Sequence, residues 1–186
     1  MLAAVVLLGG AGAAAGQSVA PDEDVIYVLL DGSRSRWCAY ASKDRWAAKT
    51  EQVGPDMLGY LEYRHDRLQR INLRVAADTG DWIVDDSYTV DQIGQLVGLS
   101  RVIRYFSERE LRSERFAIQG GKARLIEQSY KDVYTGRPLQ LPRLNKTFDS
   151  WPMYLSKEGL PFVALLPRKA ETKRAGEFCV VIRKPE

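Results

Sequence analysis

Apolar and polar residues alternate along most of the chain between residues 57 and 134, and turn-forming residues interrupt the alternation. A period of two residues is typical of β-strands that bury one face. The pattern predicts three hairpins, whose turns hold His65-Asp66, Asp91-Gln92 and Gly120-Gly121. Their strands are expected at 58–64 and 67–75, at 82–90 and 96–106, and at 115–119 and 122–134, with a bulge near Gly98. This part of the chain is therefore predicted to form an antiparallel meander.

The segments on either side of the meander add shorter elements. Apolar runs predict strands at 25–30 and 37–41, and Ser42 is placed to cap a helix at 43–52 that Gly54-Pro55 ends. Two more strands are expected at 162–166 and 178–183, joined by a charged loop at 167–176. The predicted fold class is α+β, predominantly antiparallel β: a single meander-type sheet of about seven to nine strands with one short N-terminal helix packed against it.

The N-terminus differs from the rest of the chain, because residues 1–16 hold no charge and consist mainly of Ala, Val, Leu and Gly. An apolar run followed by small residues is typical of a secretory signal peptide, although the charged n-region is missing. We expect cleavage after Ala15 or Gly16, a flexible lead-in at 17–24 and a single β-rich domain at 25–186. A disordered or membrane-tethering N-terminus is the alternative. The leader predicts a secreted protein, periplasmic or extracellular, with no transmembrane span in the mature chain, because spanning helices need about 20 apolar residues.

Two cysteines, Cys38 and Cys179, lie near opposite ends of the expected domain. Disulfides form and persist in the compartments that exported proteins reach. We therefore expect a Cys38–Cys179 bridge, with Cα atoms about 4.4 to 6.8 Å apart. The alternative is a pair of buried free thiols.

The charge is nearly balanced, with 27 basic and 24 acidic residues and a formal net charge of +3. Nucleic-acid binding favours a concentrated basic stripe, so the balance argues against such a partner. His65 is the only histidine, which excludes multi-histidine metal sites. No phosphate-binding loop, dinucleotide fingerprint or nucleophile elbow occurs, and we expect neither a cofactor nor a metal.

Carboxylates are dense in one stretch, at Asp78, Asp81, Asp85, Asp86 and Asp91. Their spacing lacks the alternation of a calcium loop, and neighbouring strand residues such as Asp85 and Asp86 point to opposite faces. Acid–base chemistry would require that Asp81, Asp85, Asp91 or Glu62 line one concave pocket.

Aromatic residues in or beside the meander offer a second kind of site. Trp82, Tyr88, Tyr130 and Tyr134 are the candidates for ligand-facing positions, although strand propensity alone accounts for aromatic residues in a sheet. Catalytic residues stay unknown, and the chain is expected to be non-catalytic rather than an enzyme. The leading hypothesis is an exported domain that binds an envelope component or a protein partner through its sheet face. The alternatives are a secreted hydrolase that uses carboxylates between Asp81 and Asp91, and a structural or assembly protein.

Overall fold

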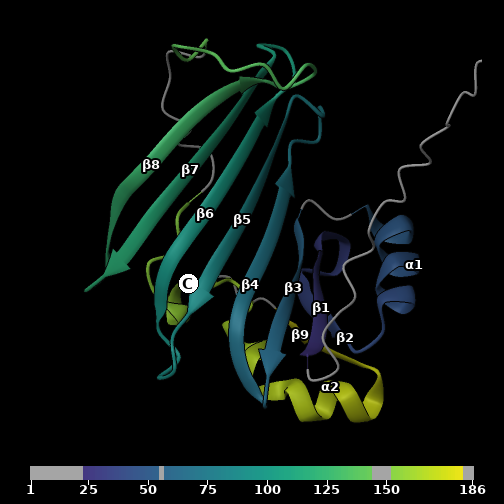
Figure 1. Ribbon diagram of the computed structural model, residues 1–186. Coiled ribbons are helices and arrows are strands. Elements are labelled where there is room, and N and C mark those ends of the chain that lie inside the picture. Colours follow the sequence, from purple (N-terminus) through teal and green to yellow (C-terminus); the bar gives the residue numbers. More distant parts are fainter. Residues whose placement is uncertain (1–22, 55–56, 144–151, 182–186) are drawn as a thin grey trace, which may run out of the picture.

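The computed structural model describes residues 23–54, 57–143 and 152–181, and it places nine strands in one antiparallel sheet (Figure 1). The expected leader, residues 1–16, lies outside the described residues. The strand order is β8-β7-β6-β5-β4-β3-β1-β2-β9. The bounds are Glu23–Asp31 for β1, Arg36–Tyr40 for β2, Met57–Arg64 for β3, Arg67–Ala76 for β4, Trp82–Val90 for β5, Leu96–Tyr105 for β6, Glu110–Gln119 for β7, Lys122–Asp132 for β8 and Glu177–Val181 for β9.

The predicted meander is confirmed, and β3 to β8 lie side by side in chain order (Figure 1). The turns explain the register. His65 and Asp66 have φ of 49° and 61°, and Gly120 and Gly121 have φ of 56° and 69°, so both two-residue loops have the positive φ of primed turns, which match strand twist. Between β5 and β6, Asp91 Oδ1 accepts hydrogen bonds from the backbone N–H groups of Ile93 and Gln95. The bulge expected near Gly98 falls on the residue before it.

The remaining strands extend the meander by pairing that is not local. β1 inserts between β3 and β2, and β9 returns from the end of the chain to pair with β2. The helix α1, Lys43–Val53, connects β2 to β3 as predicted. Ser42 Oγ accepts from the Arg45 backbone N–H, and Gly54 ends the helix at φ 52°.

The C-terminal third contains a second helix, whereas the sequence predicted a single one. The predicted charged loop at 167–176 forms a second helix, α2, at Lys169–Ala175, and the predicted strand at 162–166 is a 3₁₀ helix at Val163–Arg168. Gly176 caps α2 in the left-handed region, and Thr172 is fully buried. The error has a local cause, because a short apolar run flanked by prolines does not distinguish a strand from a buried helical turn. No helix in the described ranges is long and apolar enough to cross a membrane.

The strand β7 begins at Glu110, five positions before the predicted start at residue 115. Its first half alternates charged residues with others, and the sequence predicted no strand there. Glu110 and Arg112 nevertheless point into the protein, where Arg112 Nη2 donates to Glu110 Oε1 at 2.9 Å, and both side chains are nearly inaccessible. Buried ion pairs of this kind cannot be recognised from hydropathy.

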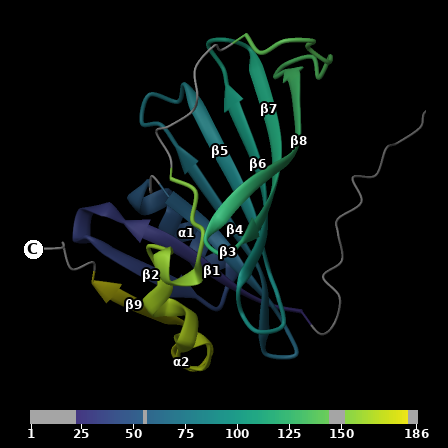
Figure 2. The same ribbon diagram turned by 90° about the vertical axis from the view of Figure 1, so that its left-hand side faces the viewer.

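One side of the sheet, here called the inner face, carries the main core, which includes Val28, Leu61, Ile71 and Leu99. The segment that follows residue 151 lies along this face (Figure 2) and buries Phe162 against Trp37, with ring centroids 5.1 Å apart.

Polar groups interrupt the inner face beneath that segment. Arg101 forms a bidentate pair with Asp86 at 2.8 and 2.7 Å, and the Tyr88 hydroxyl accepts from the Tyr154 backbone N–H at 3.1 Å. Burial opposes the charge of Arg101, but the hydrogen bonds and charge of Asp86 outweigh it and raise the pKa of Arg101. The segment is therefore held by polar groups as well as by apolar contact.

The opposite side of the sheet is here called the open face, and it carries Tyr60, Asn72, Asp85 and Ser87 on its central strands. Helix α1 covers it over β1 and β2, where Trp46 and Val53 pack against Leu29 and Tyr40. In the described part of the chain, the open face of β4 to β8 thus presents half-buried and exposed side chains to solvent.

Candidate functional site

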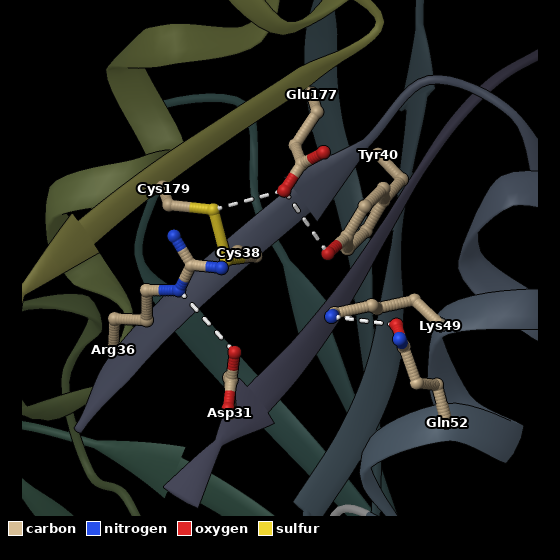
Figure 3. Close-up of a disulfide and its surroundings, with 8 residues drawn as sticks. All are labelled: Asp31, Arg36, Cys38, Tyr40, Lys49, Gln52, Glu177 and Cys179. Atoms are coloured by element: carbon tan, nitrogen blue, oxygen red, sulfur yellow. Dashed lines mark hydrogen bonds and ion pairs between the residues drawn. A yellow bond between two sulfur atoms is a disulfide. The ribbon is translucent and has the colours of Figure 1, made fainter. Parts of the chain in front are cut away.

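The disulfide predicted between Cys38 and Cys179 is confirmed (Figure 3), with an S–S distance of 2.05 Å. The two residues lie directly opposite each other on β2 and β9. Their Cα atoms are 4.1 Å apart, slightly closer than expected. A bridge fits the oxidising compartment that the sequence predicts.

Glu177 lies beside the bridge, where its Oε1 is 3.3 Å from the Cys179 sulfur and accepts from the Tyr40 hydroxyl at 3.3 Å (Figure 3). Burial, and then the charge of Glu177, raises the pKa of Tyr40 to about 12. Cys38, Cys179 and Glu177 form a group with the spacing of metal ligands. Because both sulfurs are joined in the disulfide, the oxidised protein cannot offer them as thiolate ligands.

The aromatic candidates from the sequence do not lie on the open face. Tyr88 is fully buried on the inner face, and its hydroxyl donates to Asp86 at 3.4 Å. Trp82 packs beside the inner cluster of Val84, Ile103 and Tyr105. Burial raises the pKa of Tyr88 well above the ordinary tyrosine value, so its hydroxyl stays protonated.

The other two aromatic candidates lie at the far edge of the sheet. Tyr130 on β8 stacks with Arg112, whose guanidinium carbon is 5.4 Å from the ring centroid. Tyr134 follows β8, is 64% exposed and lies under Arg109. Ligand contact by these four residues stays a prediction.

The carboxylate candidates are dispersed rather than gathered. Asp81 and Asp91 flank opposite ends of β5, and Asp91 caps the β5–β6 turn. Asp85 lies on the open face and Asp86 on the inner face, as the strand period requires. A hydrolase with two carboxylates on one substrate would need a pair that this arrangement does not bring together.

A groove lies on the open face where helix α1 meets the sheet. Its volume is about 380 Å³, within the size range of small-molecule sites. Helix α1 and strands β3, β4, β5 and β6 contribute the lining, which includes Trp46, Leu58, Tyr60, Asn72, Arg74, Asp85, Ser87 and Val102. An apolar floor with a few polar groups is the usual composition of a binding site.

One wall of the groove is aromatic and fixed in place. Trp46 Nε1 donates to the Val28 carbonyl oxygen at 3.1 Å, which sets the orientation of the indole ring. Tyr27 connects the wall, with ring centroids 5.3 Å from Trp46 and 6.4 Å from Tyr60. Tyr60 is 39% exposed, so part of its ring is available to a ligand.

The other wall is polar and preorganised. Arg74 forms a bidentate pair with Asp85 at 2.6 and 3.2 Å, and Arg104 also pairs with Asp85. The hydrogen bonds of Asp85 raise the pKa of Arg74. Two guanidinium groups share one carboxylate, so one positive charge is left over, and Arg74 keeps half of its side chain exposed. Asn72 is similarly held, because its Nδ2 donates to Glu62 at 3.0 Å.

Beyond the groove, basic side chains dominate the open face. We define the basic patch as seven basic residues that the strand register places on this face of β4 to β8, leaving out Arg67 beside the β3–β4 turn: Arg70, Arg74, Arg104, Arg115, Lys122, Arg124 and Lys131. The same face carries three carboxylates, on Glu62, Asp85 and Glu127. Arg115 and Glu127 pair at 2.7 Å, both well exposed, where an ion pair contributes little stability. Lys122, Arg124 and Lys131 have no ion pair within the described residues.

Two larger hollows, of about 460 and about 530 Å³, lie at the end of the sheet that holds the β5–β6 turn. The β5–β6 and β7–β8 turns and the segment at 155–167 line them, together with buried side chains such as Tyr63, Leu96 and Ile118, whereas the groove joins held aromatic rings to held hydrogen-bonding groups. We therefore take the groove as the candidate site. Sequence reasoning missed Trp46 and Tyr60, because only the insertion of β1 beside β3 brings helix α1 over this part of the sheet.

Comparison of the chain with protein-family models, with curated proteins and with solved structures finds no match.

Proposed function

We propose that this protein is an exported, non-catalytic binding domain whose ligand, a component of the cell envelope, enters the groove beside helix α1. The observation that carries the proposal is the pairing of two fixed walls. Trp46 and Tyr60 offer an aromatic surface, and Asp85 holds Arg74 and Arg104 on the nearby strands β4 and β6. Because both walls are already ordered, binding costs little side-chain entropy.

The chemistry of the walls favours recognition over catalysis. The carboxylate in the groove is committed to two arginines, and the nearest acid across the strand, Asp86, faces the core. Aromatic rings beside amide, hydroxyl and guanidinium groups suit a ligand with one apolar face and many hydroxyls, as a sugar ring has. A glycan of the cell envelope has this chemistry and would be met by an exported protein.

The test is co-sedimentation of the purified protein with isolated cell envelope from the native host, separated into membrane and glycan fractions. The variant Tyr60→Ala removes the exposed half of the aromatic wall and should weaken sedimentation by about tenfold, since stacking contributes roughly 1 kcal/mol or more. Leu141→Ala is the control, because Leu141 is an exposed apolar residue outside the groove. Equal loss for both variants, or no sedimentation of the wild type with either fraction, would contradict the proposal.

A further inference from the structure

We infer that the ligand of the open face is an acidic polysaccharide, which would occupy the groove with one sugar unit and run across the basic patch toward β8. This inference rests on the proposed function and names the ligand class for the same site. The groove accounts for one sugar ring only. The basic patch extends over five adjacent strands, which spans about 19 Å at the usual strand separation.

Charge complementarity is the first argument. The open face of β3 to β8 holds the seven basic residues of the patch against three carboxylates, whereas the whole chain has a formal charge of only +3. The imbalance is local. Lys122, Arg124 and Lys131, which have no ion pair among the described residues, all lie on β8, at the side of the sheet opposite helix α1. A ligand with repeated negative charges would therefore be attracted along the whole width of the patch.

The side chains between the charges are the second argument. The register places Ser87, Ser100, Ser113 and Ser129 on the same face of β5, β6, β7 and β8. Small hydroxyl-bearing side chains leave the surface low between the long arginines and lysines, and they both donate and accept hydrogen bonds. An extended chain of hydroxylated, charged rings fits such a surface.

The distribution of aromatic and apolar groups argues against two other negatively charged partners, single-stranded nucleic acid and an anionic membrane. Binding of single-stranded nucleic acid uses aromatic platforms for successive bases. Among the described residues of β3 to β8, the only aromatic residue that the register places on this face is Tyr60, at the groove. Docking to an anionic membrane usually adds apolar side chains that enter the lipid. Among the patch strands, the most exposed apolar side chains are Leu125 and Ile126, on the edge strand β8. Leu125 lies opposite the inner-face residue Phe116, so it does not add an apolar group to the open face for insertion into lipid.

The test measures binding of fluorescently labelled polyuronate and of neutral dextran of equal length to the full chain. Wild-type protein should bind the polyuronate at least about tenfold more tightly than dextran, and this preference should shrink between about 50 and about 200 mM NaCl. The triple variant K122Q/R124Q/K131Q removes three unpaired charges of the patch. It should weaken polyuronate binding by about tenfold and lower its salt dependence, and it should leave dextran binding unchanged.

A second triple variant, R34Q/K43Q/R174Q, is the matched control. It removes the same total charge from exposed positions outside the open face, and it should change polyuronate affinity by less than about twofold. Equal losses for the two triple variants would overturn the inference, because they would show attraction to net charge alone. Binding of single-stranded DNA or of anionic vesicles as tightly as polyuronate would also overturn it. If dextran binds as well as polyuronate, the acidic class is wrong and glycan binding in the groove still stands.

Discussion

The disulfide should contribute a large share of the stability, because it closes most of the chain. Cys38 and Cys179 are 141 residues apart in sequence. On the chain-entropy model, a loop of that size removes unfolded-state freedom equivalent to about 5 kcal/mol at 25 °C. A compact denatured ensemble would reduce this figure, so we expect about 3 to 5 kcal/mol. For a domain of this length, that loss lowers the melting temperature by roughly 6 to 20 °C.

The assay compares three forms in thermal melts and urea titrations: oxidised wild type, wild type reduced with dithiothreitol, and C38A/C179A. The reduced form keeps both sulfur atoms, so its loss reports the crosslink alone. The double variant adds the cost of a small cavity at the fully buried Cys38. The strand content should survive in both, because the β2–β9 ladder and the packing of Trp37 on Phe162 do not depend on the bridge.

Thiol labelling of the unreduced, denatured protein checks the premise, and no labelled thiol is expected. Two labelled thiols per chain would refute the bridge. Oxidised and reduced forms that melt within about 1 °C of each other would refute the reasoning even with the bridge present. In that case the denatured chain would already hold its two ends close together.

Three further predictions concern the sheet itself. Asp86→Asn leaves the buried Arg101 guanidinium without its charged partner and should cost about 3 to 5 kcal/mol in urea unfolding. Gly59→Ala places a Cβ 2.1 Å from a backbone oxygen of the neighbouring strand and should cost about 1 to 3 kcal/mol, whereas Gly32→Ala, with no atom within 4 Å, should be nearly neutral. Hydrogen bonds from the Thr135 backbone N–H and hydroxyl hold the pKa of Asp132 well below its ordinary value. The contribution of Asp132 to the free energy of unfolding is therefore complete above the pKa of the unfolded state, about 4. It is lost as the pH falls through the lower pKa of the folded state. The stability difference between wild type and Asp132→Asn should shrink as the pH falls from about 6 to about 2, and a constant difference would contradict the assignment.

The sequence predicted the features that depend on neighbouring residues. The hairpin turns at His65-Asp66 and Gly120-Gly121 and the cap at Ser42 each fix geometry within a few residues, and all three are confirmed. The Cys38–Cys179 disulfide was predicted from the expected compartment, in which disulfides persist, and not from local geometry. The predicted start of β7 was wrong because Glu110 and Arg112 form an ion pair inside the protein. The sequence does not show which charges will be buried together.

The candidate site was hidden for a topological reason. Trp46 and Tyr60 belong to a helix and a strand that are consecutive in sequence, but they share a wall only because β1 inserts beside β3 and Tyr27 fills the space between their rings. Strand insertion of this kind depends on long-range pairing, and residue periodicity reports only local order. The aromatic residues that the sequence proposed as ligand-facing within the meander, Trp82 and Tyr88, lie on the inner face, where strand propensity and core packing account for them.

The charge distribution shows how a balanced composition conceals a charged surface. Arg101 and Arg112 point to the inner face, where Asp86 and Glu110 neutralise them out of reach of solvent. Each of these buried pairs is neutral, so it leaves the net charge of the remaining surface unchanged. The open face is positive because the seven basic residues of the patch share it with three carboxylates, while the other acidic side chains lie elsewhere. Near-neutral composition therefore argues against a chain that is basic throughout, and it does not exclude one basic face. The partner must be judged from the face that solvent reaches, and on this protein that face carries the groove and the basic patch together.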